Sequence, residues 1–184
     1  MINSLFSVPL LTLSLDSHLA DYMENLVTPK LPKLHYLKEE NVYSDYNQPN
    51  KLIKGKDLKK FTDIVNPICK KFASEVNISL ENPKIDYWLQ DYKSNQSMEL
   101  HSHPGSLLSG VYYIRANENA GSISFQNPNP YLYFQKHIDK SRMNYNHTVK
   151  PQKGMLILFP GYLFHKTIPS KNPNVQRTVL AFNF

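Results

Sequence analysis

The chain has 184 residues, a length that one domain can accommodate without a second core. Its single cysteine excludes an internal disulfide and therefore a disulfide-stabilised secreted scaffold, so we expect a reducing, cytoplasmic location. The formal net charge is +6, but the lysines are scattered and form no long basic block. This pattern favours a solvated basic surface over a nucleic-acid interface without excluding one.

The N-terminal part of the sequence predicts a strand, two helices and an irregular connection. Segment 5–15 is apolar but lacks the basic leader and the cleavage site of a signal peptide, so we interpret it as a strand and expect no membrane partner. Asp16 is a candidate N-cap for a helix over 18–27, where apolar residues recur at helical spacing. Residues 28–55 hold three prolines and show no period, which indicates an irregular surface segment. The strongest helical periodicity covers residues 56–76.

The rest of the chain is a series of short β-favouring segments parted by turn residues. These segments are 85–92, 97–103, 107–114, 121–126, 147–151, 154–160 and 177–184. Short strands that follow one another in this way predict a sandwich or jelly roll, with the long helix packed outside one sheet. We therefore expect a mainly β fold with flanking helices, built as a single domain over 1–184. In it, residues 1–82 pack on a jelly-roll core formed by 83–184.

Two histidines one residue apart stand at the head of the apolar segment "HSHPGSLLSGVYYI". On a strand, such residues point to the same face about 6.6 Å apart, so His101 and His103 could bind one metal ion. Paired histidines are also common on protein surfaces, so a metal site needs a third ligand. His165 follows the buried-looking segment "GMLILFPGYLF", where a polar ring must find a partner. It is either that ligand or a core histidine hydrogen-bonded to the backbone.

The last β-favouring segment carries a charge on an apolar face. A two-residue alternation places Arg177 beside Val175, Val179 and Ala181. An unpaired buried cation is costly, so an internal arginine implies an anion, either a protein carboxylate or the carboxylate of a bound ligand. If the strand lies at a sheet edge, the guanidinium merely reaches into solvent.

Taken together, these features resemble the iron(II)- and 2-oxoglutarate-dependent oxygenases, in which an arginine follows the last histidine on the final strand. The lead-in "YKSNQSMELHSH", with Tyr92 and Asn95 before the first histidine, resembles the prolyl-hydroxylase-like branch. "HSHPGSLLSGVYYI" and "PQKGMLILFPGYLFHKTIP" are similar to a group of such oxygenases found in bacteria and phages. The resemblance covers about residues 83–184 and implies the cupin-like double-stranded β-helix, a form of jelly roll.

The resemblance implies an iron(II) site formed by His101, His103 and His165. Most of these enzymes hold iron with two histidines and one carboxylate, and here His103 stands at the carboxylate position. A neutral ligand leaves the centre one charge more positive, which should weaken its hold on iron but attract a dianionic co-substrate. By strand parity Glu99 lies on the same face as His101 and could supply a carboxylate instead.

The same resemblance implies that 2-oxoglutarate is the co-substrate and that Arg177 binds its far carboxylate. Tyr113 stands where the resembling enzymes place a hydroxyl on that carboxylate, although an aromatic core residue would explain it too. Tyr92 is a weaker candidate for the same role, since packing explains it equally well. Segment 127–146 displays several aromatic residues and is either a lid over the substrate or a surface insertion.

We therefore expect an oxygenase, most simply a hydroxylase, that releases succinate and CO₂. Its substrate is not indicated by the sequence and could be a prolyl or other side chain, a small metabolite or a nucleobase. Two alternatives remain open. A three-histidine dioxygenase would oxidise its substrate without 2-oxoglutarate, and a non-catalytic module on the same barrel would bind a partner without iron. If the protein is phage-encoded, its expected location is the host cytoplasm.

Overall fold

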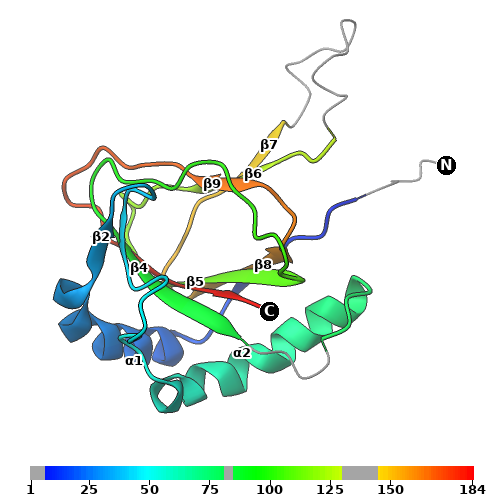
Figure 1. The fold of residues 1–184 in the computed structure, drawn as a ribbon, viewed down its shortest axis with the longest axis horizontal. Coiled ribbons are helices and arrows are strands. Elements are labelled where there is room, and N and C mark those ends of the chain that lie inside the picture. Colours follow the sequence, from blue (N-terminus) through cyan, green and yellow to red (C-terminus); the bar gives the residue numbers. More distant parts are fainter. Residues whose placement is uncertain (1–6, 81–84, 130–144) are drawn as a thin grey trace, which may run out of the picture.

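The computed structural model describes residues 7–80, 85–129 and 145–184. These residues form two antiparallel β-sheets, with helices packed against the larger one (Figure 1). The strands are β1 (Leu11–Ser14), β2 (His35–Leu37), β3 (Val42–Ser44), β4 (Asp86–Tyr92), β5 (Leu108–Ala116), β6 (Ile123–Gln126), β7 (Asn146–Val149), β8 (Met155–Pro160), β9 (His165–Thr167) and β10 (Arg177–Asn183). The helices are α1 (Ser17–Val27), the 3-10 helix η1 (Thr28–Lys33) and α2 (Gly55–Glu75).

The larger sheet has the strand order β1-β8-β5-β10-β4-β3-β2. Strand β10 lies between β4 and β5 and pairs antiparallel with both, so that Leu180 faces Leu89 on one side and Tyr112 on the other. Its first residue, Arg177, is opposite Tyr92 of β4 and Ala116 of β5. Arg177 is therefore held in the middle of the sheet, and the alternative of an edge strand is wrong.

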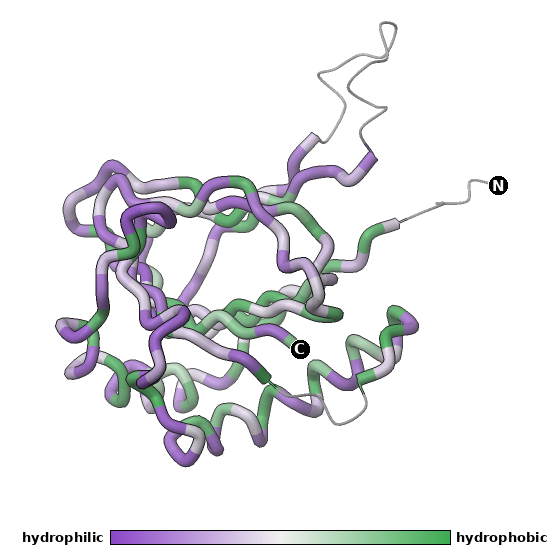
Figure 2. Tube along the Cα trace, viewed as in Figure 1, coloured by the Kyte–Doolittle hydropathy of each residue, from purple (hydrophilic) through white to green (hydrophobic). Residues whose placement is uncertain are grey.

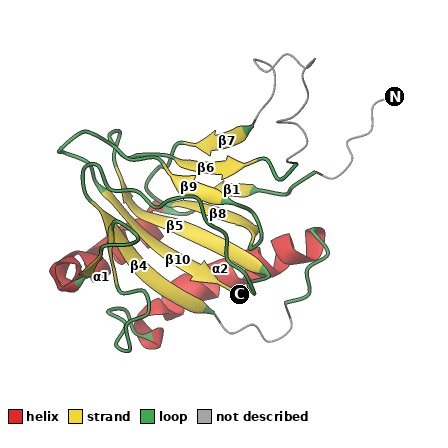
Figure 3. Ribbon diagram, turned by 45° about the horizontal axis from the view of Figure 1, so that its top comes forward, coloured by secondary structure: helices red, strands yellow, loops and turns green. Residues whose placement is uncertain are grey.

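The smaller sheet has the order β7-β6-β9 and lies over one face of the larger sheet (Figure 3). Side chains of β10 alternate between two apolar clusters, as expected for a strand buried on both faces. Val179 packs with Ile123 and Phe125 of β6, whereas Leu180 and Phe182 belong to the cluster on the helix side. Two facing antiparallel sheets form a jelly roll, which confirms the mainly β fold with flanking helices predicted from the sequence.

Helices α1 and α2 cover the outer face of the larger sheet (Figure 3). Asp16 caps α1 as predicted, because its side chain accepts a hydrogen bond from the His18 amide at 2.6 Å. Phe61 of α2 packs against Tyr112 and Phe182, with ring centroids 5.2 and 5.9 Å apart. Hydrophobic and hydrophilic residues alternate along α2, while hydrophobic residues dominate the central strands (Figure 2). The prediction of a long helix packed outside one sheet is confirmed.

Residues 28–55 differ from the prediction of an irregular segment. They contain η1 and a hairpin formed by β2 and β3, which extends the larger sheet beyond β4. Each of the two strands has three residues, which is too short for a two-residue period to stand out in the sequence. Strand β9 was not predicted for the same reason.

Residues 97–103 were predicted as a strand, and this is wrong. The segment makes one isolated β-bridge, between His101 and His165, and is otherwise irregular. A turn at Pro104 and Gly105, where Gly105 has φ of 88°, prevents the segment from continuing as a strand into β5. Most of the predicted lid or insertion, 127–146, lies outside the described residues. None of the described helices combines the length and the apolar character needed to cross a membrane.

Candidate functional site

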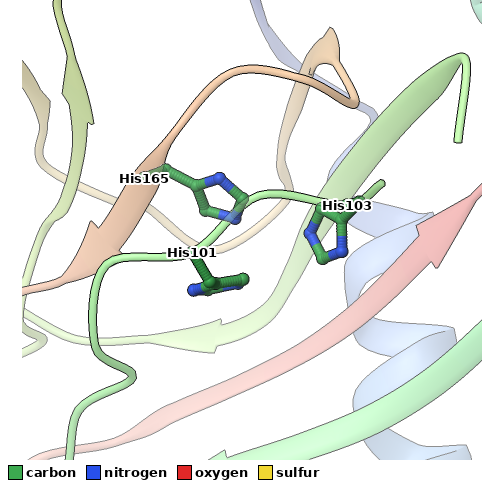
Figure 4. Close-up of side chains that lie close together, drawn as sticks. All are labelled: His101, His103 and His165. Atoms are coloured by element: carbon green, nitrogen blue, oxygen red, sulfur yellow. The ribbon is translucent and has the colours of Figure 1, made fainter. Parts of the chain in front are cut away.

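Three histidine side chains converge between the two sheets (Figure 4). Their ring centroids are 4.3 Å apart for His101 and His165, 5.1 Å for His103 and His165, and 5.2 Å for His101 and His103. One nitrogen from each ring lies within 4.8 Å of the other two, and no carboxylate of the described residues belongs to the group. Imidazole nitrogens at this spacing can bind one divalent transition-metal ion.

Backbone hydrogen bonds bring the three histidines together from two distant segments. The His101 amide donates to the His165 carbonyl at 2.9 Å, and the His165 amide donates to the His101 carbonyl at 2.8 Å. The paired side chains leave the same face, so their rings become neighbours. The His103 amide donates to the Gly161 carbonyl at 2.8 Å. Glycine is needed there, because a Cβ at position 161 would lie 2.2 Å from the carbonyl oxygen of Ser106.

The hydrogen bonds of two rings leave their other nitrogen free for a metal. His101 Nδ1 is 2.7 Å from the Glu99 carbonyl oxygen, and His165 Nδ1 is 2.9 Å from that of Leu163. A carbonyl oxygen only accepts, so each Nδ1 carries a hydrogen and each neutral ring presents an unprotonated Nε2. Carbonyl groups that orient a ring in this way are typical of metal-binding histidines.

Burial keeps two of the imidazoles neutral. It lowers the pKa of His165 to about 3 and the pKa of His103 to about 4, and the nearby His101 adds to both shifts. His165 is 4% exposed and packs against Phe159, with ring centroids 4.7 Å apart. Only neutral imidazole binds a metal, so the surroundings favour the ligand form of both rings over the protonated form at neutral pH.

A cavity of about 50 Å³ extends from the histidines into the space between the sheets. Its apolar lining is Trp88, Met98, Val111, Ile123, Val179 and Ala181. Its polar lining, besides the histidines, is Gln90, Tyr92, Tyr113, Thr167 and Arg177. An apolar space with a few convergent polar groups is the usual form of a small-molecule site.

Arg177 lies in this cavity without an anionic partner among the described residues. Its side chain is 3% exposed, and no partner is found for Nε within the described ranges. Nη1 reaches the Ile168 carbonyl oxygen at a long 3.5 Å. The guanidinium also lies over the Tyr92 ring, 4.3 Å from its centroid, which is a cation–π contact. A buried cation left this way costs several kcal/mol, so the cavity is suited to a carboxylate ligand.

The two tyrosines beside Arg177 differ in what their hydroxyls can do. The Tyr113 hydroxyl is fully buried beside the Arg177 guanidinium, which opposes the rise in the pKa of Tyr113 that burial causes. It makes no hydrogen bond of normal geometry within the described part of the chain. The Tyr92 hydroxyl is already used, since it donates to Gln90 Oε1 at 3.1 Å. Burial raises the pKa of Tyr92 to about 12, so its hydroxyl stays protonated and the side chain is neutral beneath Arg177. Tyr113 is therefore the better placed of the two to donate to a ligand.

The residues predicted from the sequence lie together around one cavity. Glu99, considered as an alternative ligand, is exposed and contributes its backbone carbonyl instead of its carboxylate. The prediction did not include Trp88, Gln90 or Thr167, all of which line the cavity. The alternation Trp88, Gln90, Tyr92 on β4 is a signal that could have placed the first two on the face of Tyr92.

The residues fit an iron(II) ion and 2-oxoglutarate. Neutral imidazoles gather at one place in the cavity, and the Tyr113 hydroxyl and Arg177 Nε lack partners among the described residues at another. A dicarboxylate with one end on a metal would satisfy the buried guanidinium with its other end.

Comparisons with known proteins agree with this fit. A family model described as "Putative 2OG-Fe(II) oxygenase" matches residues 86–183. No curated protein matches the sequence. A prolyl-4-hydroxylase from Pseudomonas putida is similar in structure with a TM-score of 0.71, covering 97% of this chain and 92% of that chain at 13% sequence identity.

Two further solved structures have the same fold. HygX from Streptomyces hygroscopicus, with nickel and 2-oxoglutarate bound, has a TM-score of 0.60, covering 96% of this chain and 82% of that chain at 10% identity. A prolyl hydroxylase from Trichoplax adhaerens, in complex with a hypoxia inducible factor peptide fragment, has a TM-score of 0.57, covering 95% and 82% at 13% identity. The jelly roll is thus the double-stranded β-helix of these enzymes. With its family match extending over β4 to β10, the chain belongs to the iron(II)- and 2-oxoglutarate-dependent oxygenases.

Proposed function

We propose that this oxygenase hydroxylates its substrate at a centre held by three histidines, with 2-oxoglutarate bound across the cavity. One observation carries the proposal: a buried, unpaired guanidinium shares a cavity with three convergent imidazoles. No carboxylate of the described residues neutralises Arg177, and a co-substrate carboxylate would do so. The cavity therefore has a chemical reason to take up a dicarboxylate beside a metal.

In this proposal His101, His103 and His165 would hold iron(II) through ring nitrogens. Hydrogen bonds from Nδ1 of His101 and His165 to backbone carbonyls fix the orientation of those two rings before any metal binds. When bound, iron(II) and 2-oxoglutarate supply the oxidising chemistry: O₂ gives one oxygen atom to the substrate and one to succinate, and CO₂ is released. The apolar walls of the cavity exclude water from this reaction.

Arg177 would bind the carboxylate of 2-oxoglutarate that is remote from the metal. The Tyr113 hydroxyl, free of partners among the described residues, would donate a second hydrogen bond to it. Tyr92 would position Arg177 without contacting the co-substrate. Its ring makes a cation–π contact with the guanidinium, and its hydroxyl donates a hydrogen bond to Gln90. This assigns Tyr92 a positioning role in place of the direct contact expected from the sequence.

Incubation of the iron(II)-loaded protein with 2-oxoglutarate and O₂ tests the proposed function. We expect slow formation of succinate and CO₂ even without the true substrate, dependent on both iron and O₂, measured by chromatography of the acids. Candidate substrates, such as prolyl peptides or small metabolites, should raise that rate. Iron binding with substrate oxidation but no succinate would instead support a three-histidine dioxygenase. Absence of iron binding would support a non-catalytic module.

A further inference from the structure

The larger sheet lines the cavity with three rows of side chains that run across β4, β10 and β5. The rows are Tyr92 with Arg177, then Gln90, Val179 and Tyr113, then Trp88, Ala181 and Val111. Side chains on one face recur at every second residue, so neighbouring rows are about 6.8 Å apart. The third row reaches the histidines, because the ring centroids of Trp88 and His103 are 6.0 Å apart. The middle row therefore lies between Arg177 and the proposed metal site.

Gln90 brings a buried carboxamide to the middle row. Its Oε1 accepts a hydrogen bond from the Tyr92 hydroxyl at 3.1 Å, and its Nε2 donates to Met98 Sδ at 3.1 Å. The opposite orientation of the amide would place the lone pairs of its oxygen against those of the sulfur, which supports this one. An amide nitrogen carries two hydrogens, and a thioether is a weak acceptor. Within the described ranges Nε2 has no other partner, so much of its donor capacity is unused.

Three groups in the cavity can donate a hydrogen bond and lack a good acceptor among the described residues. They are Gln90 Nε2, Arg177 Nε and the Tyr113 hydroxyl. A buried donor without an acceptor is destabilising, so the cavity favours a ligand with acceptors along its whole length. The remote carboxylate of the co-substrate would accept from Arg177 and Tyr113, which leaves Gln90 for the other end. The amide of Gln90 points that way, because it faces Met98, three residues before His101.

We propose that Gln90 is a further co-substrate-binding residue, whose amide donates a hydrogen bond to an oxygen atom at the metal-side end of 2-oxoglutarate. The inference rests on the proposed function, because it takes the three histidines as the metal site and Arg177 as the partner of the remote carboxylate. Gln90 thereby makes the direct contact from β4 that the sequence predicted for Tyr92. The two ends of the co-substrate are then bound by different rows of the same sheet.

Titration calorimetry of the manganese(II)-loaded protein with 2-oxoglutarate tests this contact without any need for turnover. Gln90→Met keeps the length of the side chain but removes the amide, and we expect it to weaken 2-oxoglutarate binding roughly tenfold. Manganese affinity without co-substrate should stay the same, which also shows that the variant is folded. Gln176→Met, the same substitution at an exposed glutamine, is the matched control and should change 2-oxoglutarate affinity less than about twofold.

A direct contact and an effect through Tyr92 are separated by Tyr92→Phe, which removes only the hydroxyl that Gln90 accepts from. It should lose less 2-oxoglutarate affinity than Gln90→Met, and an equal loss would overturn the inference.

Visible absorption of the anaerobic iron(II) complex reports on the metal-side end, because its charge-transfer band arises from the chelate. Removal of a hydrogen bond to the chelating oxygens raises the energy of the orbital that accepts the electron. At saturating 2-oxoglutarate we therefore expect the band of Gln90→Met at shorter wavelength, whereas Arg177→Met should not move it. An unmoved band, or unchanged affinity in Gln90→Met, would overturn the inference. Wild-type protein that binds manganese but no 2-oxoglutarate would instead refute the proposed function, so the two failures are distinguishable.

Discussion

Replacing His101 with alanine should abolish stoichiometric iron(II) binding while the protein stays folded. The ring is only partly buried, so its removal leaves no large internal cavity. It is nevertheless next to both other histidines, with ring centroids 4.3 Å from His165 and 5.2 Å from His103. Two remaining imidazoles bind far more weakly than three, and we expect affinity to fall by more than about a hundredfold. Anaerobic equilibrium dialysis with iron analysis measures this directly.

His165→Ala should also lose iron, but it will cost stability. His165 is 4% exposed and packs against Phe159 and Phe125, so truncation creates a cavity worth roughly 2 kcal/mol or more. A lower melting temperature is therefore expected for this variant and not for His101→Ala. His18→Ala, on the exposed face of α1, is the control for loss of a histidine remote from the cavity. Full iron occupancy in His101→Ala would refute the assigned site.

Replacing Arg177 with methionine should weaken 2-oxoglutarate binding by about a hundredfold to a thousandfold. The variant removes a buried charge that would pair with the co-substrate carboxylate, and such losses typically cost 2–5 kcal/mol. Metal binding without co-substrate should be unchanged or slightly tighter, because a cation is removed from the cavity. Titration calorimetry with manganese(II), before and after addition of 2-oxoglutarate, separates the two affinities.

Arg177→Met should also stabilise the apoprotein. Without ligand, Arg177 is 3% exposed and has no ion-pair partner among the described residues, so a methionine of similar volume should not destabilise the apoprotein and should raise its melting temperature. Lys166→Met, which removes an exposed cation from strand β9 of the smaller sheet, should alter neither property. An unchanged 2-oxoglutarate affinity in Arg177→Met would show that the guanidinium does not bind the co-substrate.

The sequence predicted the longest helix and the longest strands correctly, but it also predicted a strand over 97–103, where the chain makes one isolated β-bridge. Helix α2 and strands β4, β5, β8 and β10 extend over six or more residues. The helical period of α2, the alternation along β10 and the β-favouring residues of the other three strands were clear in the sequence. Strands β2, β3 and β9 have three residues each and exist only because they pair with neighbours already in place. Pairing of this kind depends on residues that are distant in the sequence, so no local sequence pattern predicts these short strands.

The candidate site was likewise predicted only in part from the sequence. Alternation along β10 correctly placed Arg177 with Val179 and Ala181, because period two holds in a regular strand. The two histidines of the H-x-H segment share a site for a different reason than predicted. A bridge to His165 and a bond to Gly161 hold them on an irregular segment.

The most direct test of the account is an anaerobic titration of the apoprotein with iron(II) and 2-oxoglutarate, followed by visible absorption. Chelation of iron(II) by 2-oxoglutarate gives a weak charge-transfer band that neither component gives alone. We predict that this band appears only when both are present and saturates at one equivalent of each. Iron that binds at His101, His103 and His165 without developing the band as 2-oxoglutarate is added would contradict a site in which Arg177 and the metal share one co-substrate.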